Sequence, residues 1–408
     1  MEGQMRSIWI RRTILLAAVA GTLIGLVPSA AGFTGWTVVP SPNAGQWGSV
    51  LSSVSARSPT DVWAVGVAAT TSSNQTLAIH WNGANWAVTP TANPVANCQD
   101  GNIQWAGNRL NAVASVSSSD VWAVGTSCYQ MNTVTEHWNG STWRLVPSPS
   151  IPTGGDGINN VLNGIAAISS VNVFAVGFHT AVNGAYQTLV ERWSGSSWSI
   201  VASPNPNSTV SILSAAAGSG ASDVWAVGYQ NVGSKSNPLI EHWNGASWAV
   251  VPSPARPGGS VLTAVTAITP TDAWAVGSQP APSGATTTLI EHWNGASWSV
   301  VSSPNVDTQY GSANVLRGVS AVSSSDVWAV GMFQNANTSY HQHRTFVLHW
   351  NGSGWSRVPS PSPGKSGELN AVSALPTGQV WTAGLYSIYD IDIYQGTYTA
   401  PKTLVIGG

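Results

Sequence analysis

Residues 222–254 read SDVWAVGYQNVGSKSNPLIEHWNGASWAVVPSP, and this stretch decides the fold. The run DVWAVG ends in glycine, LIEHW has a β-rich centre, and WAVVPSP stops at prolines. The Asn244-Gly245 pair between the last two runs is a strong hairpin signal, because both residues tolerate a positive φ. A run of small and branched residues, as at 369–375, precedes the DVWAVG-like segment. Each unit therefore predicts four short strands.

The same unit recurs along the chain with a period of roughly fifty residues, and no helical periodicity appears after the leader. The DVWAVG-like segments begin at Asp61, Asp120, Asn172, Asp223, Asp272, Asp326 and Gln379. Four-stranded units with this period predict the blades of a β-propeller, which bury their faces only against neighbouring blades.

The two ends of the repeat region complete each other. Residues 35–42 (GWTVVPSP) are a fourth strand without a third, and residues 402–407 (KTLVIG) are a third strand without a fourth. If the two strands pair, seven complete blades result and the ring is closed, which removes exposed sheet edges. The sequence thus predicts an all-β, seven-bladed propeller of four-stranded blades as a single domain over 32–408.

Residues 1–31 have the form of a secretory signal peptide. Three arginines lie before residue 13, an apolar run covers 14–27, and small residues follow at 29–31. The apolar run is short for a membrane span, which needs about 20 residues, although an uncleaved anchor stays open. We expect an exported protein, secreted or in the cell envelope, with no membrane span in the mature chain.

Composition argues against nucleic-acid binding. Charged residues make up 7% of the chain and the net charge is −2, so no basic field for phosphates exists. Cys98 and Cys128 are the two cysteines, and both are expected in variable loops near one blade. In an exported protein they predict one local disulfide.

The units resemble those of bacterial secreted propeller repeat proteins that are loosely related to the kelch and Asp-box groups. The WNGxxW turn from Trp138 to Trp143 is similar to an Asp-box hairpin, with Asn in place of the Asp. The glycine after WAV is similar to kelch, but the paired glycines of that group are missing. The resemblance implies the architecture and no activity, because both groups include enzymes, binders and scaffolds.

Residues that recur at every blade are interpreted as architecture. Nineteen of the 22 tryptophans occupy three repeat positions, where each can bury its ring between blades and place its N–H on a backbone acceptor. One repeat position holds histidine in five units and arginine in the third: His80, His137, Arg192, His242, His292 and His349. A catalytic group is needed once, so we expect these side chains to link strands through hydrogen bonds, for example to the Asp of DVW.

Loops that join second to third strands, and loops that join units, are predicted to share one face, here called the variable-loop face. Function concentrates in such loops. The acidic residues of the mature chain outside the repeat positions all map there: Asp100, Asp156, Asp307, Glu368, Asp390 and Asp392. Trp47, Trp105, His341 and His343 map there as well.

Three clusters on this face are candidates for a site. Residues 385–398 alternate aromatic and acidic side chains, which suits stacking on a sugar, or they form an extended hairpin. Residues 97–105 and 154–160 carry carboxylates and amides without the spacing of a calcium loop. His341 and His343 could ligate zinc but lack a third ligand nearby, so no metal is predicted. The candidate ligand-binding residues are Trp47, Asp100, Trp105, Asp156, Tyr386, Tyr389, Asp390, Asp392 and Tyr394.

The favoured function is an exported, monomeric, non-enzymatic binding or scaffold protein. Its ligand is expected to be a cell-surface glycan or a protein at the variable-loop face. No catalytic residue and no cofactor are predicted. One alternative is a polysaccharide hydrolase or lyase that uses loop carboxylates, of which a glycosidase would need two about 5–10 Å apart. Another alternative is a purely structural envelope protein. Arg109, Arg317 and Lys365 offer limited cationic support for acidic sugars.

Overall fold

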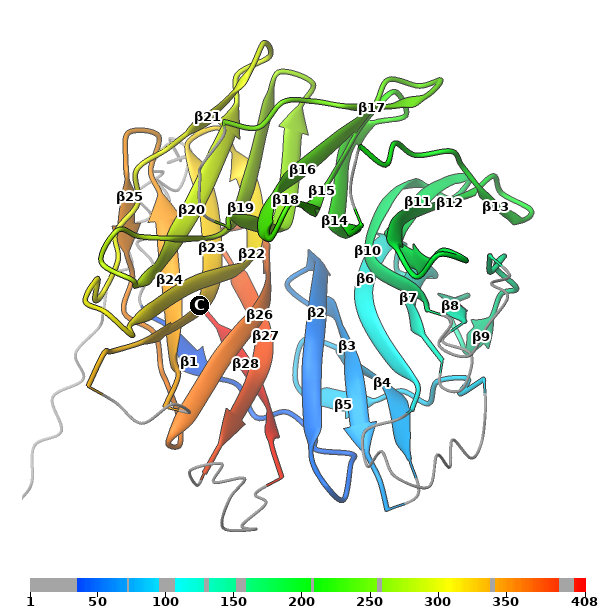
Figure 1. The fold of residues 1–408 in the computed structure, drawn as a ribbon. Helices are drawn as coiled ribbons and strands as arrows, with labels where there is room; N and C mark the ends of the chain where they lie inside the picture. The colour runs from blue at the N-terminus through cyan, green and yellow to red at the C-terminus, as the bar shows by residue number, and fades with distance from the viewer. Residues whose placement is uncertain are drawn as a thin grey trace, which may run out of the picture. The chain divides into compact units, whose positions relative to one another are not determined.

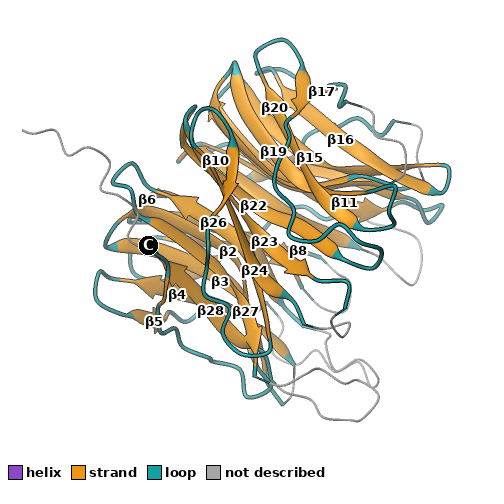
Figure 2. Cartoon of the chain, turned by 90° about the vertical axis from the view of Figure 1, so that its left-hand side faces the viewer, coloured by secondary structure: helices purple, strands orange, loops and turns teal. Residues whose placement is uncertain are grey.

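The computed structural model describes residues 35–71, 73–94, 107–127, 132–151, 159–206, 209–254, 259–337, 342–388 and 400–408. Every regular element within these residues is a β-strand, as Figure 2 shows. The described residues accordingly contain no helix that is long and apolar enough to span a membrane.

The strands follow one another in groups of four (Figure 1). The first strands are β2 (Ser49–Ser58), β6 (Arg109–Ser117), β10 (Asn160–Ser169), β14 (Ser211–Gly220), β18 (Val261–Thr269), β22 (Ala313–Ser323) and β26 (Ser366–Ala374). The second strands are β3 (Asp61–Ala69), β7 (Asp120–Thr126), β11 (Asn172–Thr180), β15 (Asp223–Val232), β19 (Asp272–Pro280), β23 (Asp326–Gln334) and β27 (Val380–Ser387).

The outer two strands of each group are shorter. The third strands are β4 (Asn74–Trp81), β8 (Thr133–Trp138), β12 (Tyr186–Trp193), β16 (Lys235–Trp243), β20 (Thr286–Trp293), β24 (Arg344–Trp350) and β28 (Lys402–Gly407). The fourth strands are β5 (Trp86–Val88), β9 (Trp143–Leu145), β13 (Trp198–Ile200), β17 (Trp248–Val250), β21 (Trp298–Val300), β25 (Trp355–Arg357) and, from the start of the described chain, β1 (Thr37–Val38).

Within each group, neighbouring strands pair antiparallel in chain order. Five groups are separate four-stranded sheets, and β18–β21 and β22–β25 share one sheet through the single parallel pair Thr286 and Ala313. In the last group β1 pairs with β28, so that Val38 faces Ile406. β1 covers only two of the residues predicted for the N-terminal strand. The prediction of an all-β fold of four-stranded antiparallel sheets, consistent with a propeller, is confirmed.

The glycine of each DVWAVG-like segment allows the first two strands to approach closely. A Cβ atom on Gly228 would lie 2.0 Å from the carbonyl oxygen of Ile212, and the glycine has the same position in every group. Beside it, the first strand carries an extra residue that shifts the register, as between Leu213 and Ala215. Such a bulge bends a strand and redirects the side chain of the extra residue.

Tryptophan rings fill the space between successive groups. Trp225 of β15 contacts Trp293 and Trp298 of the next group, with centroid distances of 4.9 and 5.1 Å. The last group meets the first in the same way, because Trp381 lies 5.2 Å from Trp81 and 5.6 Å from Trp86. The predicted burial between units is confirmed for the second- and fourth-strand tryptophans, whereas the third-strand rings other than Trp243 are partly buried.

Candidate functional site

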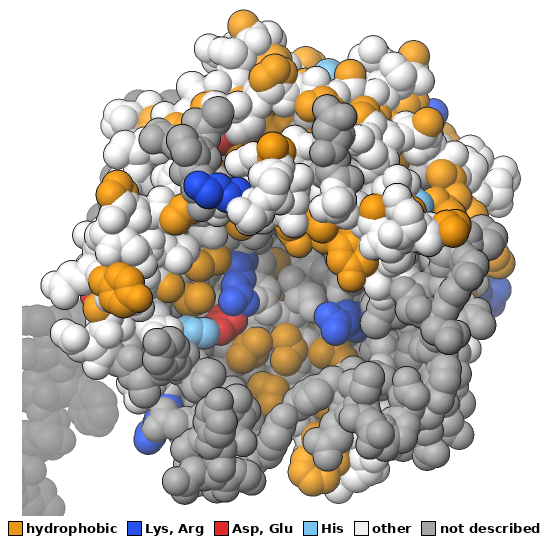
Figure 3. Space-filling view, viewed as in Figure 1, with side chains coloured by type: hydrophobic (Ala, Val, Ile, Leu, Met, Phe, Trp, Pro, Cys, Tyr) orange, Lys and Arg blue, Asp and Glu red, His pale blue; other side chains and the backbone are white. Residues whose placement is uncertain are grey.

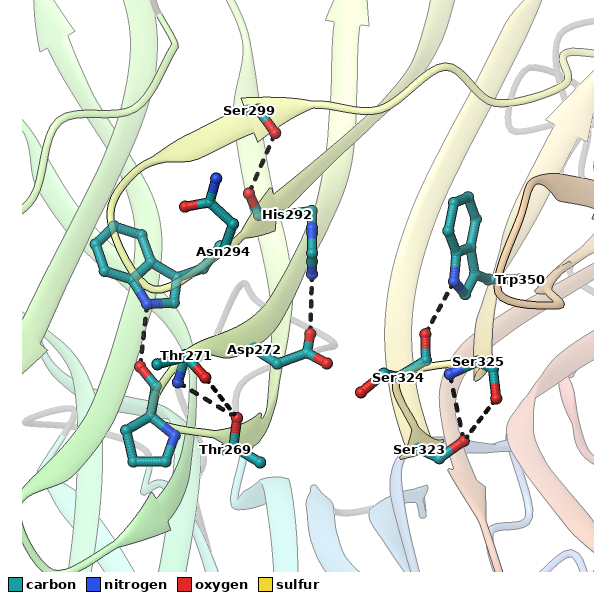
Figure 4. Close-up of polar contacts among 12 residues, drawn as sticks. Thr269, Thr271, Asp272, His292, Asn294, Ser299, Ser323, Ser324, Ser325 and Trp350 are labelled. Carbon is teal, nitrogen blue, oxygen red and sulfur yellow. Dashed lines mark hydrogen bonds and ion pairs between the residues drawn. The ribbon is translucent and has the colours of Figure 1, made fainter.

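The repeated histidines bind the aspartates of the DVW segments. His292 Nε2 lies 2.9 Å from Asp272 Oδ1, and Figure 4 shows the two side chains pointing toward each other. The imidazole also contacts the ring of Trp274 at a centroid distance of 4.2 Å. The same His–Asp pair occurs in four further groups, at 2.7 to 2.9 Å. The prediction that these side chains link strands is confirmed.

The third group replaces both members of this pair. Arg192 Nε donates to Asn172 Oδ1 at 2.9 Å, and the guanidinium lies over the rings of Phe174 and Trp243. The third group therefore keeps the side-chain hydrogen bond and the aromatic contact of the His–Asp pair, although both side chains of the pair differ. The pair serves the packing of the sheets and provides no repeated catalytic group.

The indole N–H groups do not all behave as predicted. The third-strand tryptophans donate to a backbone carbonyl, as Trp293 Nε1 does to Pro270 O at 3.1 Å. The second- and fourth-strand tryptophans that lack a partner in the described part of the chain are Trp63, Trp86, Trp122, Trp143, Trp198, Trp225, Trp248, Trp274, Trp298, Trp355 and Trp381. Their rings are buried against other rings, often edge to face, where no backbone acceptor is within reach.

Four glutamates at one repeat position are fully buried: Glu136, Glu191, Glu241 and Glu291. Burial raises the pKa of Glu136 to about 7 and the pKa values of Glu191 and Glu241 to about 8. Glu136, Glu241 and Glu291 accept hydrogen bonds from the preceding group. Ser203 Oγ, for example, donates to Glu241 Oε2 at 2.6 Å. In the other three groups the equivalent residues, Ile79, Leu348 and Ile406, are apolar and fully buried.

Most of the predicted ligand-binding residues lie outside the described residues: Asp100, Trp105, Asp156, Tyr389, Asp390, Asp392 and Tyr394. Cys98 and Cys128, the predicted disulfide, lie outside them too. Trp47 is described and has 54% of its surface exposed. Tyr386 lies in β27 and packs against the buried core of the last group. Ligand binding by these residues stays a prediction.

A charged group lies between the sixth and seventh groups of strands. Arg317 Nη1 of β22 lies 2.5 Å from Glu368 Oε2 of β26, and His343 Nδ1 contacts the other carboxylate oxygen. The backbone of His343 is fixed to the start of β26, because its carbonyl accepts from Gly367 N at 2.9 Å. Burial raises the pKa of Glu368, but the hydrogen bond from His343 and the charge of Arg317 outweigh it, so the pKa lies below its ordinary value.

One member of this charged group, Arg317, lines a cavity of about 310 Å³. The cavity is lined by the first strand of every group and includes Arg317. Figure 3 shows the molecule hollowed at this face, with apolar side chains on the floor and basic, acidic and histidine side chains together on the wall. Ligand sites of proteins have volumes from about 300 Å³ upward. The cavity is thus large enough for a small ligand.

The extra residues at the bulges of the first strands surround the cavity: Ser52, Asn111, Asn163, Ser214, Thr263, Arg317 and Asn370. We call these the bulge residues. Several donate to the leucine carbonyl just before the bulge of the next group, as Asn111 Nδ2 does to Leu162 O at 2.8 Å. Asn370 Nδ2 donates to Leu51 O of the first group at 2.8 Å. Such bonds reach Leu51, Leu162, Leu213 and Leu316, and so satisfy part of the free edge of four of the seven first strands.

No known protein family and no curated protein matches the chain. Solved structures do match. "YCF48 bound to D1 peptide" has a TM-score of 0.52 at 14% identity and covers 92% of this chain and 95% of its own. A polysaccharide lyase, the PL25 ulvan lyase bound to -[GlcA(1-4)Rha3S]-, has a TM-score of 0.52 at 10% identity, with coverage of 82% and 88%.

A GH74 xyloglucanase from Xanthomonas campestris also has a TM-score of 0.52, at 14% identity, and covers 90% of this chain and 55% of its own. At such identities the likeness shows the fold alone. The neighbours are β-propeller-like proteins, and the described residues have a fold of that class. The finer resemblance to the kelch and Asp-box groups stays a prediction.

Sequence reasoning missed the site formed by Arg317, His343 and Glu368. Each residue was recognised separately, as a cation, a potential zinc ligand and a loop-face acid. His343 and Glu368 are 25 residues apart and belong to different groups of strands. One signal was available: Arg317 is the one charged residue among the seven bulge positions, which are otherwise serine, threonine or asparagine.

Proposed function

We propose that residues 32–408 form a seven-bladed β-propeller whose ring is closed by β1 on β28. Seven groups of four strands support this count. The Trp381 contacts with Trp81 and Trp86, and the bond from Asn370 to Leu51, support closure. Residues 1–31 act as a signal peptide, and Cys98 and Cys128 form a disulfide.

The propeller works as an exported, monomeric binding or scaffold module, and its ligand is a glycan or a protein at the variable-loop face. Neighbours of the same fold are titled as bound to a peptide, as glycan-acting enzymes, or as the extracellular domain of a putative one-component system. These titles support a binding role outside the cytoplasm.

The observation that carries the proposal is the charged group beside the central cavity. Repeat positions elsewhere are filled by the same few side chains, whereas Arg317 breaks the repeat in the cavity lining and is paired with Glu368, which His343 also contacts. The ion pair is partly buried, with 32% of the Arg317 side chain and 13% of the Glu368 side chain exposed, and such a pair contributes little net stability, so its presence beside a cavity favours a role in recognition.

A hydrolase or lyase is the second candidate. The contact of His343 with Glu368 orients the imidazole as in a general-base pair. Against a glycosidase, the lowered pKa of Glu368 keeps this carboxyl ionised at neutral pH, so it is a poor general acid. The binding role is therefore favoured.

A glycan array and a pull-down on intact cell surfaces, both with the purified protein, test the function. We expect binding that falls at least tenfold in Arg317→Leu and is unchanged in the control Glu136→Gln, which replaces a carboxyl between sheets. Release of reducing ends or unsaturated products from bound glycans would identify an enzyme. If the protein binds nothing in either assay, the alternative of a purely structural protein is favoured.

A further inference from the structure

The seven bulge residues form two sets that differ in how far their side chains are hydrogen-bonded within the protein. In the fifth, sixth and seventh groups the side chains are engaged within the protein. Thr263 Oγ1 donates to Leu316 O at 2.7 Å, Arg317 Nη1 donates to Asn370 Oδ1 at 2.9 Å, and Asn370 donates to Leu51 O. This half of the cavity wall has little hydrogen-bonding capacity left apart from the remaining N–H groups of Arg317.

The first four groups present the opposite situation. Ser52 Oγ and Ser214 Oγ are half-buried at the cavity and have no hydrogen-bond partner within the part of the chain that the structure describes. Asn111 and Asn163 each use one N–H on a leucine carbonyl. Their amide oxygens and second N–H groups are unbonded among the described residues. Four adjacent side chains thus offer neutral donors and acceptors.

The remaining lining is apolar or small. It comes from the residues that follow the bulge residues along the first strands, which include Val54, Val113, Ile165, Val319 and Val372. The hollow in Figure 3 accordingly has apolar side chains on its floor. An arc of hydroxyls and amides above apolar surface matches a ligand with polar edges and C–H faces, and ligand pockets commonly combine these features.

We infer that the central cavity binds one neutral, hydroxyl-rich ring of a glycan, such as a terminal hexose, through Ser52, Asn111, Asn163 and Ser214, with the remaining N–H groups of Arg317 as further donors. The inference rests on the proposed binding function and names the ligand class and the residues. A carboxylate-bearing sugar is less suited, because Glu368 already neutralises Arg317 and the arc of four side chains carries no charge. The volume of about 310 Å³ accommodates one ring and excludes a folded partner.

Saturation-transfer NMR with the full-length protein tests the inference. The probes are methyl β-glucoside, methyl β-galactoside and methyl α-mannoside, with glucuronate as the anionic comparison and N-acetyl-leucinamide as a peptide-like one. We expect at least one neutral hexoside to bind, and the double variant Ser52→Ala/Ser214→Ala to weaken its binding about tenfold, because two neutral hydrogen bonds are lost.

The double variant should melt as the wild type does, since neither hydroxyl has a partner in the described residues. Ser247→Ala is the matched control, because Ser247 lies in the turn before β17 rather than in the cavity lining, and hexoside binding should not change. If glucuronate binds in preference to the neutral hexosides and Arg317→Leu abolishes its binding, the inference that the ligand is neutral is wrong. If only N-acetyl-leucinamide binds, the inference that the ligand is a glycan is wrong.

The failure of the inference and that of the proposed function are distinguishable. Glycan-array binding that the double variant retains would overturn the cavity site and leave the binding function intact. If no sugar binds the cavity and the array and pull-down are also empty, both proposals fail.

Discussion

Replacing one buried glutamate should change how stability depends on pH. Glu241 is fully buried, and its carboxylate accepts one hydrogen bond, from Ser203 Oγ. Burial raises the pKa of Glu241 from 4.5 to about 8. The folded protein therefore holds a proton that the unfolded chain has released between these values. The stabilisation from this protonated carboxyl is fully present below the pKa of the unfolded chain, 4.5. It is lost as the pH rises through the pKa in the folded protein, about 8.

The size of the effect follows from the two pKa values. One pKa unit corresponds to about 1.36 kcal/mol of unfolding free energy, and the dependence on pH weakens close to each pKa. The contribution of Glu241 to the unfolding free energy should therefore fall by about 3 kcal/mol between pH 5 and pH 8. Glu241→Gln keeps the shape and the acceptor for Ser203 and does not titrate. We expect the variant to lose about 3 kcal/mol less than the wild type over this range, measured by urea unfolding at both pH values.

Glu368→Gln is the matched control with the opposite sign. The pKa of Glu368 is lowered, so its contribution is present above the unfolded pKa and is lost as the pH falls. Glu368→Gln should therefore destabilise the protein equally at pH 5 and pH 8, and less only below the ordinary glutamate pKa of 4.5. An equal loss of stability in Glu241→Gln and the wild type between pH 5 and pH 8 would refute the reasoning.

Two further variants test the packing and the closure. His292→Ala should lower the melting temperature, with a loss of about 1–2 kcal/mol, because the bond to Asp272 and the contact with Trp274 disappear; unchanged melting with lost ligand binding would contradict this role. Asn370→Ala and Asn163→Ala remove equivalent bonds, to Leu51 O and Leu213 O, and should each cost about 1–2 kcal/mol. If only Asn163→Ala destabilises the protein in thermal melts, the first and last groups do not meet in solution.

The sequence alone determined the repeating architecture. The spacing of DVWAVG, HW and WNGxxW fixes where strands and tight turns fall, because these preferences act over a few neighbouring residues. It also indicated that Trp225 and its equivalents are buried between sheets and that His292 and its equivalents bond the DVW aspartates. A side chain that recurs in nearly every unit must contact neighbours that recur with it.

Only the tertiary structure decided the site. Arg317 and Glu368 meet because a bulge turns the arginine toward the next group of strands, and a bulge leaves no distinct mark on the alternation of residues. That the hydroxyls of Ser52 and Ser214 have no partner among the described residues follows from which neighbours satisfy the other bulge residues, and this is a property of the assembled sheets. Local preferences are set along the chain, whereas partners across the cavity depend on register and on the packing of separate sheets.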